Sequence, residues 1–429
     1  MQIHIVKRGD TLYNIALTYG TTIEAIIDAN ELQSSQYLVV GQALVIPIIG
    51  HFYFVKQGDS LYSIAQKFDL SYEQLAQINN IPVDRPLPIG SRLYIPEQEK
   101  NDITSFAYIE PRGKSVSPIL ENTAKKVAPY LTYLAPFSYT INRDGSLNPP
   151  PLNKFKQIAK ENNTSLTLVI SNIEEGAFSS EIAHIILTVK AVQNKFFDQI
   201  INIATTVGFT DVHFDLEFIP PEDREAYHSF LRHAKERFSQ AGLLLSTALA
   251  PKTSATQKGI LYEAHDYRVH GEVADFVILM TYEWGYSAGP PMAVSPINEV
   301  RKVVEYALTE IPANKILLGQ NMYGYDWTLP FVAGGEIAQA LSPQQAVDLA
   351  RKQHVAIEYD STAQAPFFTY IDSEDKQHEV WFEDARSIQA KFDLIRELNL
   401  RGIAYWKLGL AFPQNWLLLS NQFNIEKNE

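Results

Sequence analysis

The chain of 429 residues contains no cysteine. Disulfides, zinc–thiolate sites, iron–sulfur clusters and cysteine nucleophiles are therefore excluded, and the fold must be stabilised by packing. No apolar run reaches the length of about 18 residues that marks a membrane span. The N-terminal segment MQIHIVKRGDT also lacks the apolar core of a secretory signal. We therefore expect no signal peptide, so that the protein stays where it is made or leaves by another route.

The chain has fewer basic than acidic residues: 36 Lys and Arg compared with 49 Asp and Glu, which gives a formal net charge of −13. Nucleic acids and anionic membranes are bound through basic surfaces, so neither is an expected general partner. Aromatic residues are abundant, with 22 Tyr, 22 Phe and 5 Trp. Flat rings suit sugar-binding clefts, although ordinary packing accounts for most of them. The length and the 46% hydrophobic content predict two or three domains.

The first hundred residues contain an internal repeat. The segment HIVKRGDTLYNIA, from His4 to Ala16, recurs as YFVKQGDSLYSIA, from Tyr53 to Ala65. The spacing between the copies stays constant to their ends, without a gap. Each copy predicts a short strand, a Gly-Asp turn, two helices and a strand that closes on Ile-Pro.

This strand–helix–helix–strand unit resembles the LysM module, whose pattern V-x-x-G-D-[ST]-L-x-x-I-A, then Asn, then G-x-x-L-x-I-P, both copies match. LysM modules bind glycans that contain N-acetylglucosamine, such as peptidoglycan and chitin. The resemblance predicts modules at residues 1–48 and 51–97, with the glycan-binding residues Gly9, Asp10, Thr11, Leu12 and Asn30 in the first and Gly58, Asp59, Ser60, Leu61 and Asn79 in the second. Alternatively, Asp10 and Asp59 cap helices, Leu12 and Leu61 belong to the core, and backbone groups bind the glycan.

A short polar segment from Glu97 to Asp102 is typical of a linker. Beyond it, apolar runs alternate with helical patterns such as Pro221–Gly242 and Phe382–Leu400, as in βα units. The candidate strands are Ile103–Ile109, Leu131–Phe137, Ser165–Ser171, Val212–Phe218, Leu243–Ala250, Asp275–Tyr282, Lys315–Tyr323 and Gly402–Leu408. The sequence predicts an α/β fold: a (β/α)8 TIM barrel over residues 101–429, with a small strand insertion around 328–381.

The fourth candidate strand carries a line of ionisable side chains. In the segment DVHFDLEF, strand alternation places Asp211, His213, Asp215 and Glu217 on one face. Barrel chemistry lies at the C-terminal ends of strands, where neighbouring carboxyl groups suit glycosidic cleavage: one stays protonated beside an ionised partner. Spacing alone leaves two other interpretations open, an ion-paired structural strand and a metal site, although no second ligand cluster supports a metal.

Four segments resemble glycoside hydrolase family 18. DVHFDLEF is similar to the family's strand-four motif D-x-x-D-x-D-x-E, and the others are MTYE at Met280–Glu283, YGYDW at Tyr323–Trp327 and YWKLG at Tyr405–Gly409. The resemblance covers about Asn101 to Leu419. With the LysM copies, the whole chain resembles the spore cortex-lytic N-acetylglucosaminidases of the SleL/YaaH type, which act on cortical peptidoglycan during germination.

The resemblance implies a retaining, substrate-assisted mechanism in which the substrate's own 2-acetamido oxygen is the nucleophile. Glu217 would be the general acid and then the base that activates water. Asp215 would hold the acetamido N–H and stabilise the oxazolinium, while Tyr282 hydrogen-bonds the acetamido oxygen. Trp406 would form the floor under the sugar. Met280, Glu283, Tyr323 and His213 complete the expected substrate-binding set, although Met280 and Tyr282 also suit the barrel core.

The family implies no cofactor and no metal, a partner that is peptidoglycan or cortical muropeptides, and a monomer. It also implies a location in the spore coat or cortex, after deposition from the mother cell. The alternatives are a chitinase and a catalytically weak or inactive protein that binds peptidoglycan or chitin.

One departure from the family pattern concerns the same strand. The position two before Asp215, an Asp in typical chitinases, is His213, and the motif's first Asp position is Thr210. An imidazole holds Asp215 ionised if charged and donates one hydrogen bond if neutral. The substitution bears on the pH profile more than on the reaction. Asp211 has no catalytic role that the sequence supports.

Overall fold

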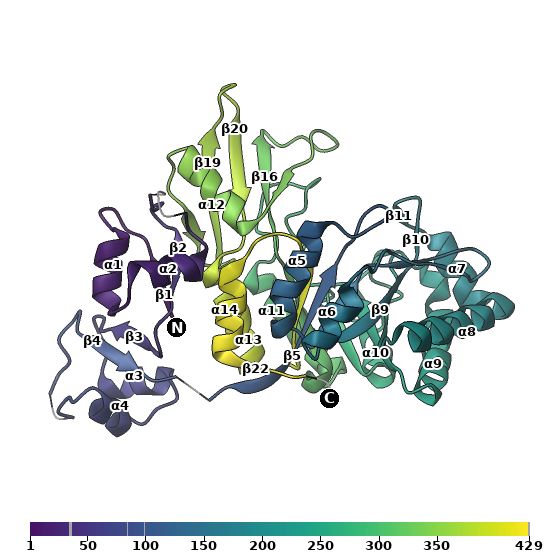
Figure 1. The fold of residues 1–429 in the computed structure, drawn as a ribbon, viewed down its shortest axis with the longest axis horizontal. Coiled ribbons are helices and arrows are strands. Elements are labelled where there is room, and N and C mark those ends of the chain that lie inside the picture. Colours follow the sequence, from purple (N-terminus) through teal and green to yellow (C-terminus); the bar gives the residue numbers. More distant parts are fainter. Residues whose placement is uncertain (34–36, 84, 98, 428–429) are drawn as a thin grey trace. The chain divides into compact units, whose positions relative to one another are not determined.

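The structure is a computed structural model that describes residues 1–33, 37–83, 85–97 and 99–427. The chain divides into two compact units, Met1–Lys100 and Asn101–Glu429, drawn in Figure 1. Gln98 of the predicted linker lies outside the described residues. Within the described ranges, no helix combines the length and the apolar composition needed to cross a membrane.

The first unit contains the two repeat copies, each a two-stranded antiparallel sheet with two helices. The first copy consists of β1 (Gln2–Ile5), α1 (Leu12–Tyr19), α2 (Ile23–Asn30) and β2 (Ala43–Ile46). The second consists of β3 (His51–Phe54), α3 (Leu61–Lys67), α4 (Tyr72–Ile78) and β4 (Arg92–Ile95). The strand–helix–helix–strand fold predicted from the repeat is confirmed.

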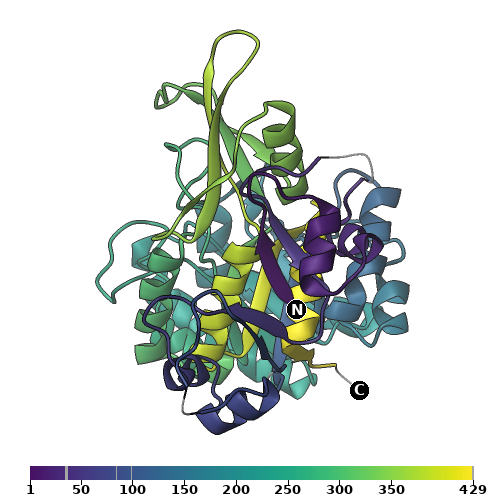
Figure 2. The ribbon, with the colours of Figure 1, turned by 90° about the vertical axis from the view of Figure 1, so that its left-hand side faces the viewer.

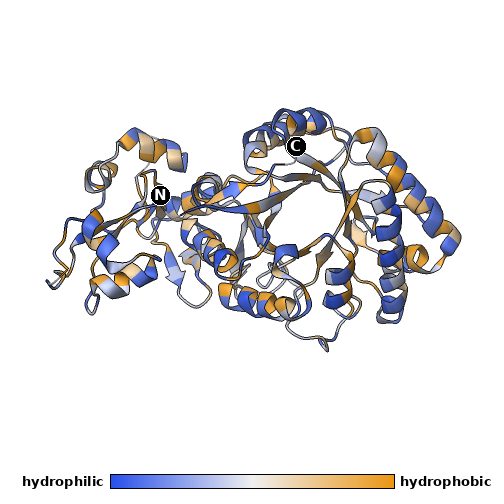
Figure 3. Ribbon diagram, turned by 90° about the horizontal axis from the view of Figure 1, so that it is seen from below, coloured by the Kyte–Doolittle hydropathy of each residue, from blue (hydrophilic) through white to orange (hydrophobic). Residues whose placement is uncertain are grey.

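The second unit is a closed barrel of parallel strands. Around the ring the order is β12-β13-β14-β15-β21-β5-β6-β9, and the pairing of β9 with β12 closes it. The strands are β5 (Asn101–Ile109), β6 (Tyr133–Pro136), β9 (Ser165–Ser171), β12 (Asp211–Asp215), β13 (Leu244–Leu249), β14 (Phe276–Leu279), β15 (Ile316–Asn321) and β21 (Gly402–Leu408). Figure 3 looks at this ring from one end, with the helices outside it. The predicted (β/α)8 barrel is confirmed.

Helices follow the barrel strands in sequence. They are α5 (Pro118–Val127), α6 (Phe155–Glu161), α7 (Ser180–Thr188), α8 (Lys190–Val207), α9 (Arg224–Gln240), α10 (Tyr267–Val273), α11 (Ile297–Glu310), α13 (Ala385–Glu397) and α14 (Pro413–Gln422). Short 3₁₀ turns lie at Ala128–Tyr130, Pro221–Asp223 and Ala313–Lys315. The predicted helix Pro221–Gly242 is observed as the 3₁₀ turn Pro221–Asp223 followed by α9, which ends at Gln240.

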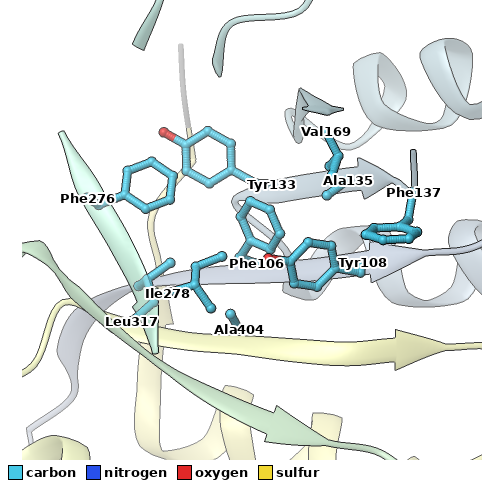
Figure 4. Packing of buried hydrophobic residues seen from close by; sticks show 10 residues of the cluster. All are labelled: Phe106, Tyr108, Tyr133, Ala135, Phe137, Val169, Phe276, Ile278, Leu317 and Ala404. Carbon is cyan, nitrogen blue, oxygen red and sulfur yellow. The ribbon is translucent and has the colours of Figure 1, made fainter. Parts of the chain in front are cut away.

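Alternation along β12 separates two environments. Phe214 points outward, where its ring packs 6.2 Å from that of Phe196 on α8 and 5.1 Å from that of Phe230 on α9. Inside the barrel, buried side chains from several strands form the cluster in Figure 4: Phe106, Tyr108, Tyr133, Ala135, Phe137, Val169, Phe276, Ile278, Leu317 and Ala404. His213 lies against it, its ring 5.4 Å from that of Phe106. The ionisable face of β12 is thus the inner face of the barrel.

An antiparallel sheet is inserted between β15 and α13. Its order is β17-β16-β20-β19-β18, built from β16 (Gly324–Leu329), β17 (Gln339–Leu341), β18 (Glu358–Asp360), β19 (Ala365–Ile371) and β20 (Gln377–Trp381), with α12 (Pro343–Lys352) between strands. Figures 1 and 2 show this sheet rising from one end of the barrel. The insertion begins at Gly324, because YGYDW itself forms its first strand.

Smaller elements complete the second unit. The hairpins β7 (Tyr139–Ile141) with β8 (Leu147–Asn148), and β10 (Ile173–Glu174) with β11 (Ala177–Phe178), follow β6 and β9. Near the C-terminus, β22 (Phe423–Ile425) pairs in parallel with the first residues of β5.

Candidate active site

A cavity of about 490 Å³ lies where the barrel strands reach their C-terminal ends. This volume suits a small ligand such as one or two sugar units. The sequence-predicted residues that line it are Asp215, Glu217, Met280, Tyr282, Glu283, Tyr323 and Trp406. They lie in or shortly after four different strands, β12, β14, β15 and β21, and only the fold brings them together.

Glu217 lies just beyond the end of β12, because the strand ends at Asp215 and not at Phe218 as predicted. Asn172, directly after β9, replaces the missing strand partner. Its side-chain oxygen accepts a hydrogen bond from the backbone N–H of Glu217 at 3.0 Å, and its amide donates to the backbone carbonyl of Glu217 at 2.8 Å. Asn172 is fully buried, so this clamp fixes the backbone from which the Glu217 carboxyl group extends.

His265 fixes the backbone of Leu216, the residue directly before Glu217. Its Nδ1 accepts from the backbone N–H of Ala250 at 2.9 Å, so the proton is on Nε2, which donates to the carbonyl of Leu216 at 3.0 Å. Burial lowers the pKa of His265 to about 4, which keeps the ring neutral in this arrangement. Neither Asn172 nor His265 is predictable from a sequence pattern, because each is a single polar residue whose partner is distant in the chain.

Asp215 and Glu217 are electrostatically coupled. Burial raises the pKa of both carboxyl groups, and the charge of Asp215 raises that of Glu217 further. The Oδ1 atom of Asp215 is buried and has no hydrogen-bond partner among the described residues. Near neutral pH the pair therefore retains a proton.

His213 is fully buried beneath this pair and does not line the cavity. Its Nε2 lies 2.8 Å from the hydroxyl of Tyr108, and its Nδ1 lies 2.8 Å from the hydroxyl of Ser246. Ser246 in turn donates to Asp211 at 2.8 Å, so the Nδ1–H of His213 donates to Ser246 and Tyr108 donates to Nε2. Burial lowers the pKa of His213 to about 3, so the imidazole is neutral.

Tyrosine hydroxyl groups from the segments that follow β14 and β15 also belong to the cavity lining. Burial, and after it the charge of Asp215, raises the pKa of Tyr282 well above its ordinary value, so this hydroxyl remains a hydrogen-bond donor. Glu283 accepts hydrogen bonds from the hydroxyls of Tyr323 and Tyr325, the latter at 3.0 Å. These contacts give Glu283 and Tyr323 fixed positions on the cavity wall.

Trp406 is held by aromatic edges. The centroid of its ring lies 5.2 Å from that of Tyr108 and 4.9 Å from that of Phe137, and both of these rings are nearly perpendicular to it. The ring lines the cavity, as does the half-buried side chain of Met280, so Met280 is not solely a core residue. The part of the chain that the structure describes contains no group of three or more His, Cys, Asp or Glu arranged to hold a metal ion.

The predicted LysM residues fall into structural classes. Thr11 and Ser60 are the N-caps of α1 and α3. Asp10 and Asp59 do not cap these helices; each accepts a backbone N–H, from Lys7 and Lys56 respectively, at 2.7 Å and closes the preceding turn. The alternative expectation that the aspartates are caps is wrong, because the next residue supplies the cap.

The remaining LysM residues divide between core and surface. Leu61 is buried, Leu12 is half-buried against its core, and both Gly9 and Gly58 are exposed with φ near +90°. The side-chain amides of Asn30 and Asn79 are engaged: Asn30 exchanges two 2.8 Å hydrogen bonds with the backbone of Val45, and Asn79 does the same with Tyr94 at 2.9 and 2.6 Å. They join the second helix of each copy to its closing strand.

The Glycosyl hydrolases family 18 model matches residues 95–411. The chain belongs to glycosyl hydrolase family 18. It is therefore a glycoside hydrolase, and the family and enzyme class predicted from its motifs are confirmed. The LysM domain model matches residues 4–47 and 53–96 of the same family 18 protein.

Relatives match the family 18 chain over its whole length. The cortical fragment-lytic enzyme of Bacillus subtilis (strain 168) is 63% identical over 427 residues, which cover 100% of this chain and 99% of that enzyme. The crystal structure of the spore cortex-lytic enzyme SleL of Bacillus megaterium QM B1551 has a TM-score of 0.91 at 52% identity, covering 100% of this chain and 99% of that one. The crystal structure of SleL of Bacillus cereus has a TM-score of 0.92 at 48% identity. The match covers 99% of this chain and 98% of that one.

The raised pKa values of the family 18 carboxyl pair predict an alkaline limit to activity. The acid must be protonated, so kcat/KM should fall as the pH rises through a midpoint well above the ordinary glutamate pKa of about 4.3. Because His213 is neutral, His213→Asn should move this midpoint by less than about half a pH unit, whereas His213→Asp adds a buried carboxyl group and should raise it. Rates on cortical peptidoglycan between pH 4 and 10 measure the midpoint, because a sugar leaving group needs the protonated acid. A shift of a full unit in His213→Asn would show that the imidazole carries charge.

Proposed function

We propose that this family 18 chain hydrolyses β-1,4 bonds that follow N-acetylglucosamine in spore cortex peptidoglycan and its fragments, by a retaining, substrate-assisted mechanism. The Asp215 side chain in the cavity, beside a Glu217 whose pKa is raised, carries the proposal. The names of the relatives, cortical fragment-lytic enzyme and spore cortex-lytic enzyme, support this substrate and a spore-associated role. Deposition from the mother cell and action as a monomer belong to the same proposal.

In the first step, Glu217 donates its proton to the glycosidic oxygen, and the substrate's acetamido oxygen attacks the anomeric carbon. The Asp215 carboxylate, which lines the cavity, accepts the acetamido N–H and stabilises the positive oxazolinium. The Tyr282 hydroxyl donates to the acetamido oxygen and orients it for attack. The leaving sugar then departs with the donated proton.

In the second step, Glu217 is ionised and removes a proton from water as the water attacks the anomeric carbon and displaces the acetamido oxygen from it. Because both displacements occur at that carbon, the β configuration is retained. The Trp406 ring, held by Tyr108 and Phe137, forms the floor under the reacting sugar. Met280, Glu283 and Tyr323 surround the same sugar, whereas His213 supports Tyr108 from below without contact with the ligand.

We propose that residues 1–48 and 51–97 hold the glycan while residues 101–429 cleave it. The exposed Gly9 and Gly58 allow close approach of a sugar to the backbone, next to Asp10, Thr11 and their equivalents Asp59 and Ser60. Asn30 and Asn79 would shape each groove by fixing its second loop, since their amides are already engaged. Leu12 and Leu61 would support the first loop from the core.

Product analysis tests the bond specificity. Digestion of purified cortical peptidoglycan, followed by borohydride reduction and mass spectrometry, should give new reducing ends that are N-acetylglucosamine. The wild-type protein and Glu217→Gln are compared on the same material. New reducing-end muramic acid would mean that the enzyme cleaves the bond that follows muramic acid. If neither the wild-type protein nor Glu217→Gln forms any product, the proposed function is contradicted altogether.

A further inference from the structure

Lys407 is the single Lys or Arg among the described residues that line the catalytic cavity. It directly follows Trp406 on β21, and in a regular strand two consecutive side chains point to opposite faces. The pairing of β21 with β5 shifts register between Tyr405 and Leu408. Such an irregularity re-aims side chains, which explains how both Trp406 and Lys407 face the cavity.

Lys407 belongs to a small charged cluster with an excess of positive charge. The Lys407 ammonium group donates a hydrogen bond to Oε2 of Glu110. Arg112 donates to the same Oε2 atom, from Nε at 3.2 Å and from Nη2 at 3.1 Å. Two cations therefore share one anion. The Lys407 side chain is 25% exposed and that of Arg112 is 80% exposed, so both remain accessible to a ligand.

The ring order places this cluster relative to the acid. β21 is four places from β12 in a ring of eight strands, so the two strands lie opposite each other. Glu217 must lie beside the bond to the leaving sugar in order to protonate its oxygen. Lys407 lies on the opposite strand, away from the leaving sugar, so the sugar that precedes the cleaved N-acetylglucosamine would extend toward it.

We propose that Lys407, assisted by Arg112, binds a carboxylate carried by that preceding sugar. The inference rests on the proposed function, because in peptidoglycan the preceding unit is N-acetylmuramic acid, whose lactyl ether carries a carboxylate either directly or at the end of the peptide joined to it. Chitin has no charged group at this position. An ammonium and a guanidinium in a partly buried cleft form charge-assisted hydrogen bonds to a carboxylate and bind a neutral sugar arm less well.

Two synthetic substrates isolate this contact. The first is the 4-nitrophenyl β-glycoside of N-acetylmuramyl-β-1,4-N-acetylglucosamine, in which nitrophenol is the leaving group and the only carboxylate is on the preceding sugar. The second is the same compound with the lactyl carboxylate converted to a carboxamide. For the wild-type full-length protein, we expect kcat/KM to be about tenfold higher for the carboxylate, mainly through KM.

For each variant we measure the ratio of kcat/KM for the carboxylate substrate to kcat/KM for the carboxamide substrate. Lys407→Met should bring it to about one, Lys407→Arg should retain most of it, and Arg112→Gln should reduce it by about two- to threefold because that side chain is largely exposed. Glu110→Gln should increase the ratio, since it frees both cations from their shared anion. Lys302→Met, which removes an exposed lysine paired with Glu299 on α11, is the matched control and should keep the wild-type ratio.

A wild-type ratio of one, or a Lys407→Met ratio equal to that of the wild type, would overturn the inference while leaving the proposed function standing. The rescue by Lys407→Arg separates loss of the charge from loss of the fold, because both variants alter the same contact with Glu110. If the wild-type protein releases nitrophenol from neither compound and also leaves cortical peptidoglycan intact, the proposed function fails and the inference fails with it.

Discussion

Glu217→Gln is expected to lower kcat on cortical peptidoglycan by about 10³-fold, while binding of the protein to the glycan through its LysM modules is unchanged. Glutamine keeps the shape of the side chain and can neither donate a proton to the glycosidic oxygen nor remove one from water. Both chemical steps lose their proton transfer together. Rates from reducing-end release and binding from pull-down on insoluble peptidoglycan measure the two effects separately.

The choice of leaving group sharpens this expectation. Nitrophenol departs without help from an acid, so the loss in the first step should be much smaller for a nitrophenyl glycoside than for peptidoglycan. Glu222→Gln is the matched control, because Glu222 is exposed on the 3₁₀ turn Pro221–Asp223 and its substitution removes the same charge. Product formation by Glu217→Gln at the wild-type rate would exclude Glu217 as the acid.

Thermal unfolding of the same variant adds an independent readout. Burial raises the pKa of Glu217, so the folded state holds this carboxyl group under an electrostatic cost. A neutral amide removes the cost, and Glu217→Gln should melt at the wild-type temperature or slightly above it. A large fall in Tm would instead mean that the loss of activity reflects damage to the fold.

Sequence patterns located the barrel well because apolar runs and turn signals are local properties. Ser165–Ser171 and Gly402–Leu408 agree with the observed strands residue for residue. The errors lie at strand ends: β14 stops at Leu279 and β12 at Asp215, short of the predicted ends. Strand pairing in the barrel ends at these points, and no local pattern encodes where a neighbouring strand stops.

The catalytic side chains were predictable from motifs, but their supports were not. The carboxylates of Asp215 and Glu217 stand out as charges in an apolar segment. Asn172 and His265 act through backbone atoms far away in the chain, so single-sequence periodicity carries no trace of them. For His213, strand alternation predicts the correct face of β12 but not how deeply the side chain is buried. Its burial keeps the imidazole neutral and places it below the cavity lining.

Asp215→Asn is the second variant with a large expected effect, a fall in kcat of about 10²-fold together with a shift of the alkaline limit. The amide cannot stabilise the positive oxazolinium as a carboxylate does. The charge of Asp215 also raises the pKa of Glu217, so its removal should lower that pKa and move the alkaline midpoint down by about one pH unit. Asp211→Asn, on the same face of β12, is the control: it lies six residues from Glu217, roughly 20 Å along an extended strand, and should leave the midpoint in place.

A change in the substrate separates the catalytic role of Asp215 from a structural one. On a glycoside whose reacting sugar is unacetylated glucosamine, the wild-type protein should already be slow, because the nucleophile and the N–H that Asp215 holds are both missing. Asp215→Asn should then cause little further loss, so that the two changes are strongly non-additive. Equal losses from Asp215→Asn on both substrates would mean that Asp215 acts through the fold and not through the acetamido group.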